Sequence, residues 1–90
     1  MGKIGRKAGV TIKVKLFTGL AEDAGLKGYD PEKGVTVQVP RGTRLRKVTK
    51  ILGLPDRRRL AYFVDGERAG LWKKLEKSHE IACLRPSGGG

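Results

Sequence analysis

The fold is decided by residues 43–55, TRLRKVTKILGLP, a segment with a sustained helical period. Thr43 precedes this period and is a candidate N-cap, because its hydroxyl can accept a free backbone N–H. Gly53 and Pro55 end the pattern, as is typical of a helix C-terminus. The apolar residues that recur at the spacing of one helix face are Leu45, Val48, Ile51 and Leu52. We therefore expect one short amphipathic helix that packs this face against a sheet.

Four segments around this helix have the pattern of β-strands. Val10–Phe17 and Val35–Val39 alternate apolar and polar residues, which is the period of a half-buried strand. Leu60–Val64 follows the helix and turns at Asp65-Gly66, a strong hairpin signal, and His79–Leu84 is the last strand. One amphipathic helix must cover one face of such a small mixed sheet. The order predicts an α+β protein of the β-grasp (ubiquitin-like) class, with four to five strands and one main helix.

The connecting segments carry weaker signals. Leu20–Ala24 is compatible with a short helix closed by Gly25, and Arg57–Arg59 is expected to be a charged loop. Leu71–Leu75 has the pattern of one tight turn that packs its two leucines inward. We expect a mobile basic arm over residues 1–9, one domain over residues 10–86, and a flexible, glycine-rich functional tail over residues 87–90.

Composition limits the functions that the chain can have. Ninety residues form one domain with little room for an enclosed catalytic cavity. The 20 basic residues against 9 acidic ones give a net charge of +11, which attracts polyanions. One cysteine allows no internal disulfide or cysteine-based metal cluster, and no apolar run is long enough to span a membrane. The N-terminal residues lack a signal peptide, so we expect a cytoplasmic protein without membrane partners.

The segment after the last predicted strand ends in Gly88, Gly89 and Gly90. Glycine has no Cβ that would block a narrow passage. The seven residues of 84–90 extend roughly 20 Å, enough to carry a terminal carboxylate into another protein's active site. The alternative is a passive end or a linker, since glycine-rich ends are common.

Several local patterns occur in an order and spacing that are fairly specific together. They are Ile12–Phe17 in the opening strand, Pro40–Thr43 before the helix, Leu52–Pro55 at its end, Phe63–Gly66 at the hairpin, and Leu75 with Glu80–Pro86 before the glycines. With these segments the chain resembles the MoaD/ThiS sulfur-carrier family, which includes the small subunit of molybdopterin synthase and the sulfur carrier of thiazole synthesis. The resemblance covers about residues 10–90.

The resemblance implies a carrier rather than an enzyme. An E1-like adenylating enzyme would use ATP to activate the carboxylate of Gly90, and a sulfur donor would convert it to a thiocarboxylate. The acceptor implied first is a large synthase subunit of molybdopterin biosynthesis; thiamine thiazole synthesis, tRNA thiolation and protein conjugation remain open. The catalytic residues would belong to these partners, and the chain itself would bind no cofactor and no metal.

The positions of four side chains in the predicted strands and turns indicate their surroundings. Phe17 and Leu84 are expected on the outward faces of two parallel, neighbouring strands, where they would form a docking patch near the tail. Cys83 is expected to face the core as a small apolar side chain. His79 is expected to be solvated, and Trp72 to pack at least partly on its turn.

Basic residues gather in and after the predicted helix. They are Arg46, Lys47, Lys50, Arg57, Arg58 and Arg59. The plain interpretation is a solvated face; the alternative is a patch that attracts an acidic partner or phosphates. The rival class of function is a small nucleic-acid-binding module that uses this face. Against it, no strand carries two alternating aromatic residues that would form a stacking platform. No nucleophile–base pair, metal-ligand spacing or phosphate loop is present in the sequence.

Overall fold

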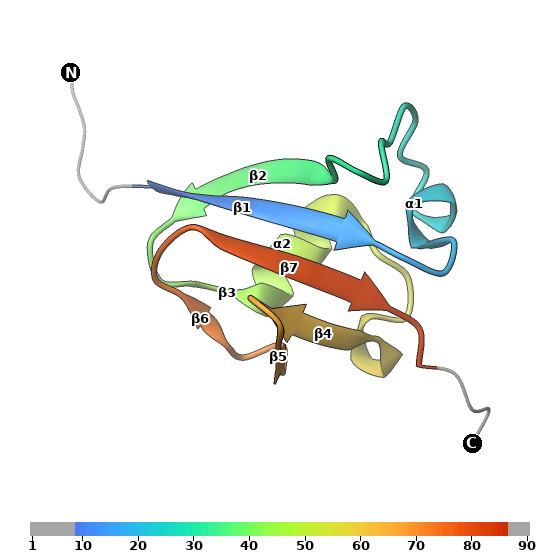
Figure 1. Cartoon of the computed structure of the whole chain (residues 1–90). Helices are drawn as coiled ribbons and strands as arrows, with labels where there is room; N and C mark the ends of the chain where they lie inside the picture. The colour runs from blue at the N-terminus through green and yellow to red at the C-terminus, as the bar shows by residue number, and fades with distance from the viewer. Residues whose placement is uncertain (1–8, 87–90) are drawn as a thin grey trace.

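The computed structural model describes residues 9–86 of the chain (Figure 1). The elements in chain order are β1 (Gly9–Leu16), α1 (Leu20–Asp23), β2 (Val35–Pro40), β3 (Thr43–Arg44), α2 (Leu45–Leu52), the 3-10 helix η1 (Arg57–Arg59), β4 (Ala61–Val64), β5 (Glu67–Ala69), β6 (Lys74–Leu75) and β7 (His79–Leu84). Every strand predicted from the sequence is present, with bounds that differ by at most one residue. Two short strands, β3 and β6, and the second hairpin strand, β5, were not predicted as separate elements.

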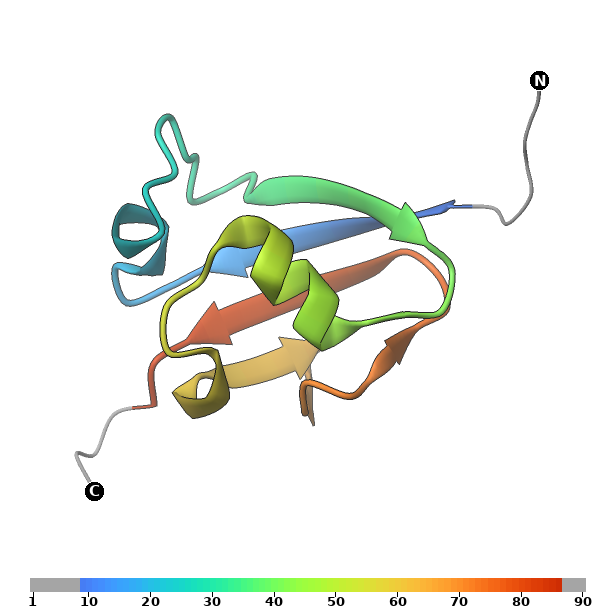
Figure 2. The same ribbon diagram turned by 180° about the vertical axis from the view of Figure 1, so that it is seen from behind.

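Within the described residues, five strands form a mixed sheet in the order β2-β1-β7-β4-β5. The two central strands, β1 and β7, are parallel, and their other neighbours run antiparallel. The helix α2 crosses one face of this sheet, and no helix of residues 9–86 lies over the opposite face (Figures 1 and 2). This arrangement confirms the predicted α+β, β-grasp architecture. A separate two-stranded pairing joins β3 to β6 beside the start of α2.

The core lies between α2 and the face of the sheet that it covers. Alternation along β1 buries one side of that strand, and the same period buries Ile81 and Cys83 of β7. Leu20 from α1 and Leu75 from β6 close the two ends and are fully buried. Leu75 is therefore packed inward as predicted, whereas Leu71 is only half-buried.

The start of α2 differs from the prediction that Thr43 caps it. The Thr43 hydroxyl donates instead to the Pro40 carbonyl at 2.6 Å, and no side chain caps the helix. The first two amides of α2 are bonded by backbone oxygens of a distant segment: Leu45 N–H donates to Lys73 O and Arg46 N–H to Leu71 O, each at 2.8 Å. A hydroxyl cap is unnecessary because these tertiary bonds already satisfy the free donors.

The buried face of α2 also differs from the predicted stripe. Ile51 is 52% exposed, whereas Thr49 is 1% exposed and occupies the core position. Buried residues 45, 48, 49 and 52 follow the i, i+3, i+4, i+7 spacing, and residue 51 lies off that face. The Thr49 hydroxyl donates to the Arg46 carbonyl at 2.7 Å, so its burial leaves no unsatisfied group.

The connection between β1 and β2 is anchored rather than loose. It begins with α1, as predicted, and Gly25 follows in the left-handed region at φ 74°. The Tyr29 hydroxyl accepts the backbone N–H of Leu16 at 2.7 Å, which fastens the connection to the end of β1. At Gly34 a Cβ would lie 2.6 Å from the Val14 carbonyl, so the chain can pass β1 there only with a glycine.

Arg57–Arg59, expected as a charged loop, forms one turn of 3-10 helix within the connection. This turn sets the path from α2 into β4. Among the residues that the model describes, no helix has the length and apolar character needed to cross a membrane.

Candidate partner-docking site at the end of β7

The uncovered face of the sheet carries apolar side chains near the C-terminal end of β7. Phe17 is 45% exposed directly after β1, and Leu84 is partly exposed at the end of β7. The parallel pairing of Leu16 with Cys83 continues through a bond from Phe17 N–H to Cys83 O at 2.9 Å. This register sets Phe17 beside Leu84, as the alternation of the two strands predicted.

The strand register brings three further apolar residues to the same face. Ala61 pairs with Leu84, and Phe63 pairs with Ala82, so their side chains share one side of the sheet. The outer apolar patch is defined here as Phe17, Ala61, Phe63, Ala82 and Leu84. Ala61 is 4% exposed and lies beneath its neighbours, while Phe63 and Ala82 are partly exposed. Leu60–Val64 is apolar throughout, so the sequence does not show that Ala61 and Phe63 face outward, and their pairing with β7 does not follow from it either.

The chain that leaves β7 is held by the connection between β1 and α1. Arg85 N–H donates to the Thr18 hydroxyl at 3.0 Å, and the Arg85 guanidinium donates to the Thr18 carbonyl at 2.7 Å. The same guanidinium forms an ion pair with Asp23 of α1. We call these three residues the Arg85 clamp. No sequence signal pointed to it, because Arg85 lies more than 60 residues from Thr18 and Asp23 in the chain.

The clamp includes a backbone conformation that is unfavourable for its residue type. Thr18 lies in the left-handed region at φ 57°, which is rare for a β-branched side chain. Such conformations cost on the order of 1–3 kcal/mol and persist where surrounding contacts hold them. Here the hydroxyl of Thr18 both donates to Phe17 O at 2.6 Å and accepts from Arg85. Thr18 therefore connects Phe17, a member of the outer apolar patch, to Arg85, where the chain leaves β7.

The predicted functional tail, Gly88, Gly89 and Gly90, lies outside the described residues. Pro86 is the last described residue. Four further residues extend at most about 14 Å.

The two candidate reactive side chains near β7 are both engaged structurally. Cys83 is 1% exposed and faces the core, as predicted, and burial raises the pKa of its thiol to about 12. The thiol is therefore protonated at neutral pH and unsuited to act as a nucleophile. The prediction that His79 is solvated was wrong: its side chain is 8% exposed, and Nδ1 lies 2.6 Å from Asp65 Oδ2.

Asp65 fastens the β4–β5 turn to the start of β7, and this contact predicts a pH effect. Glu80 N–H donates to Asp65 Oδ1 at 2.9 Å, and this bond, followed by the contact with His79, lowers the pKa of Asp65 below 3.8. A lowered pKa adds stability above the unfolded-state value, and that stability is lost as the pH falls through the folded-state value. We expect the free energy of unfolding to fall less between about pH 5 and pH 2 in Asp65→Asn than in the wild type. The difference between the two proteins should be under about 1 kcal/mol, because the site is exposed.

Denaturant unfolding at a series of pH values measures this difference. Asparagine also tolerates the φ of 51° at position 65, so the substitution removes the charge without straining the turn. Glu76→Gln is the control, because it removes an exposed carboxylate that forms no ion pair within residues 9–86. Parallel pH profiles for Asp65→Asn and the wild type would contradict the assignment.

The predicted basic residues divide into two groups in the structure. Arg46 of α2 and Arg57–Arg59 of η1 line one hollow of about 490 Å³. Lys47 and Lys50 are exposed on α2 but do not line it. Trp72 is 67% exposed, so the expectation that it packs on its turn was wrong. In the described part of the chain, no three metal-ligating side chains lie together.

No protein-family model matches the sequence, and no curated protein matches it. Solved structures with the same fold do match this chain. The putative molybdopterin converting factor, subunit 1, of Pyrococcus furiosus superposes with a TM-score of 0.65 at 16% identity, covering 87% of this chain and 99% of that one. Small archaeal modifier protein 1 of Haloferax volcanii gives 0.64 at 24% identity, with 89% and 99% covered.

Small archaeal modifier protein 1 of Methanosarcina acetivorans superposes with a TM-score of 0.60 at 22% identity, covering 92% of this chain and 99% of that one. The chain thus spans nearly the whole length of each of these small proteins. The shared architecture is the ubiquitin-like β-grasp fold, and the protein has that fold.

Proposed function

We propose that this protein is a β-grasp sulfur carrier that delivers sulfur from a thiocarboxylate on Gly90. The observation that carries the proposal is the exit of the chain from β7. There an outer apolar patch lies beside the Arg85 clamp, and the sequence continues within four residues to Gly88-Gly89-Gly90. A partner docked on the patch would find the glycines within reach. The fold shared with a putative molybdopterin converting factor subunit supports this role.

The chemistry requires a partner that binds ATP. Attack of the Gly90 carboxylate on the α-phosphate gives an acyl-adenylate and releases pyrophosphate. Hydrosulfide then attacks the carbonyl carbon and expels AMP, which leaves a thiocarboxylate. This chain supplies the carboxylate, the docking surface and a fixed exit for the tail. Cys83 is too buried and too weakly acidic to serve as the sulfur nucleophile.

The acceptor that we propose first is molybdopterin synthesis, through a large synthase subunit that receives the tail. One structural neighbour is named as a molybdopterin converting factor subunit, which favours this branch. Thiamine thiazole synthesis and tRNA thiolation would use the same activated glycine with another acceptor. The partners common to all three are an E1-like adenylating enzyme and a sulfur donor.

A second candidate function is protein modification. Two structural neighbours are named small archaeal modifier protein 1. An acyl-adenylate on Gly90 would also react with a lysine amine, giving an isopeptide bond and releasing AMP. The same docking surface and tail would serve both functions, so the acceptor of the acyl group distinguishes them.

Intact mass of the native-ended protein tests the proposal. The protein is incubated with ATP, sulfide and lysate of its source organism, beside a variant that lacks Gly90. We expect a mass gain equal to the replacement of one oxygen by sulfur, only when Gly90 is present with a free carboxylate. Higher-mass conjugates that require Gly90 would instead support modification. If neither product forms in a lysate that activates another carrier, the proposal is wrong.

A further inference from the structure

The helix-covered side of the molecule carries an exposed tryptophan among arginines. Trp72 is the single tryptophan of the chain and, at 67%, the most exposed large hydrophobic residue among residues 9–86. The guanidinium groups of Arg44 and Arg46 lie over its ring, 5.7 Å and 5.3 Å from the centroid. Arg44 Nη1 also donates to the Trp72 carbonyl at 2.8 Å. The ring is therefore held in place although most of its surface is open to solvent.

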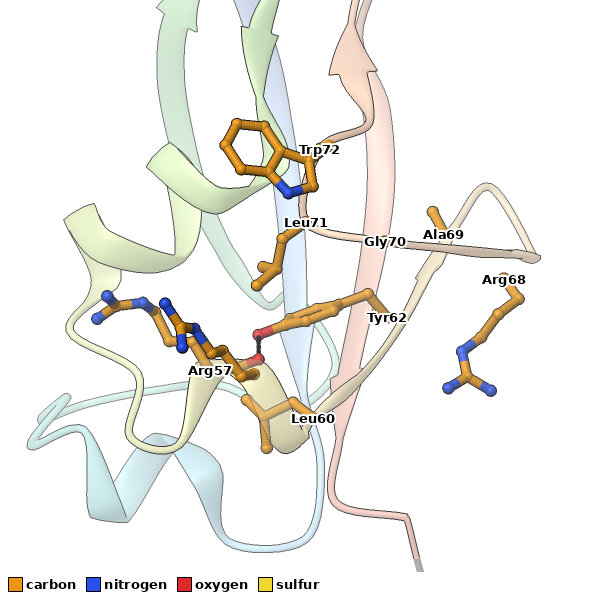
Figure 3. A pocket seen from close by; sticks show the side chains of 9 residues that line it. Arg57, Leu60, Tyr62, Arg68, Ala69, Gly70, Leu71 and Trp72 are labelled. Atoms are coloured by element: carbon orange, nitrogen blue, oxygen red, sulfur yellow. Dashed lines mark hydrogen bonds between the residues drawn. The ribbon is translucent and has the colours of Figure 1, made fainter.

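Two adjoining hollows extend from this ring toward η1. The first, of about 600 Å³, has Trp72 and Leu71 on one side and Arg57 on the other (Figure 3). Arg58 also lines it. The second, of about 490 Å³, shares Leu71, Arg57 and Arg58 with the first. A bond of 2.7 Å from the Tyr62 hydroxyl to the Arg57 carbonyl fixes η1 at the base of the first hollow. We call this continuous depression the basic groove.

The positive charge of the basic groove is not neutralised by the protein. Over residues 9–86, none of its arginines forms an ion pair, and Asp56 is the one acidic residue among those that line the two hollows. The arginines that line it are Arg46, Arg57, Arg58, Arg59 and Arg68, and Arg44 lies beside it over the Trp72 ring. They come from α2, η1, β5 and β3, so the fold rather than the sequence order gathers them. Guanidinium groups bind phosphate oxygens through paired hydrogen bonds.

We propose that the basic groove binds single-stranded nucleic acid. The arginines would bind successive phosphates, and one base would stack on Trp72, whose ring accepts any base. The site lies on the α2 side, opposite the outer apolar patch, so it does not depend on Gly90. The inference therefore goes beyond the proposed carrier function and can fail or succeed independently of it.

The composition of the groove favours nucleic acid over an acidic protein partner. The centre of a protein–protein interface is depleted in charged residues and enriched in apolar ones. Interfaces with nucleic acid are more polar and much more positively charged. Five arginines and a single acidic residue, Asp56, line the basic groove, and Trp72 is the most exposed of its apolar and aromatic side chains. Such a concentration of positive charge is typical of an interface with nucleic acid.

Fluorescence anisotropy with labelled single strands of about 12 nucleotides tests the proposal on the full-length protein. Oligouridine and oligoadenosine RNA, together with the DNA of equal length, are titrated at several salt concentrations. We expect the logarithm of the association constant to fall against the logarithm of salt with a slope of roughly −2 to −4, for three to five neutralised phosphates. Trp72→Ala is expected to weaken binding about 5- to 100-fold.

Charge-matched variants separate the groove from the general positive charge. Arg57→Gln with Arg58→Gln is expected to reduce the steepness of the salt slope by about 1 to 1.5. Lys27→Gln with Lys33→Gln removes the same charge from the exposed α1–β2 connection and should leave the slope unchanged. A variant without Gly90 should bind as well as the wild type, which keeps this test separate from that of sulfur transfer.

Three results would overturn the proposal. One is unchanged binding by Trp72→Ala in a folded protein. Another is an equal loss of affinity in the arginine and lysine double variants. The third is competition by polyglutamate at the same charge concentration as effectively as by RNA, which would assign the groove to an acidic protein instead.

Discussion

Replacing Phe17 with aspartate and Leu84 with threonine is expected to slow adenylation of Gly90 by at least roughly 100-fold, on the order of 3 kcal/mol. The two side chains form the exposed part of the outer apolar patch nearest to the Arg85 clamp. Their removal takes apolar contact area from the partner interface and introduces one charge there. Threonine keeps the strand preference at position 84, and Phe17 lies just outside β1, so the fold should be retained.

ATP–pyrophosphate exchange with the activating enzyme of the same organism measures this effect, with circular dichroism to verify the fold. Trp72→Ala is the matched control, because it removes a larger exposed apolar side chain from the opposite side of the molecule. The control should adenylate normally. A native-like double variant whose exchange rate stays within twofold of the wild type would show that the partner docks elsewhere.

The second large effect is expected in the core: Leu45→Ala should lower the free energy of unfolding by about 2–5 kcal/mol. Leu45 is fully buried at the start of α2, between the helix and the sheet. Its truncation leaves a cavity whose surroundings are tied by backbone bonds from residues 71 and 73, which limits collapse. For a domain of this size the loss is a large part of the total stability.

Ile51→Ala in the same helix is the matched control. Ile51 is 52% exposed, and alanine is the better helix former, so its free energy of unfolding should change by less than about 1 kcal/mol. Denaturant unfolding followed by far-ultraviolet circular dichroism gives both values. Equal destabilisation by the two substitutions would mean that α2 packs with the stripe expected from the sequence rather than with Leu45, Val48, Thr49 and Leu52.

The strands were predictable because their pattern is local. A sheet covered on one face imposes a period of two, and Val10–Leu16 shows it as alternating apolar and polar residues. His79–Leu84 shows it in which residues are buried. The hairpin turn at Asp65-Gly66 was predictable for the same reason, since both residues adopt positive φ angles there. The element order then left the β-grasp arrangement as the natural way to bury one helix on one small sheet.

The helix was predicted correctly in position but not in detail. Its apolar pattern was compatible with Ile51 in the core, because the sequence does not show which face α2 turns toward the sheet. Thr43 has the chemistry of an N-cap, yet its hydroxyl bonds Pro40 because residues 71 and 73 supply the acceptors. Both errors came from contacts between segments far apart in the chain.

The sequence by itself determined the order of the strands along the chain and the position of the single main helix, because both depend on patterns of neighbouring residues. It also contains the glycines that motivate the carrier proposal. The alternation of the first and last strands also placed Phe17 and Leu84 on the outward face of the sheet. Only the tertiary structure decided that Phe63 and Ala82 extend their patch, that Arg85 is held by Thr18 and Asp23, and that Arg44 and Arg46 lie over Trp72 beside the arginines of η1. The physical reason is that strand register and helix orientation are set by the packing of the whole core, and such non-local geometry leaves no periodic signal in the chain.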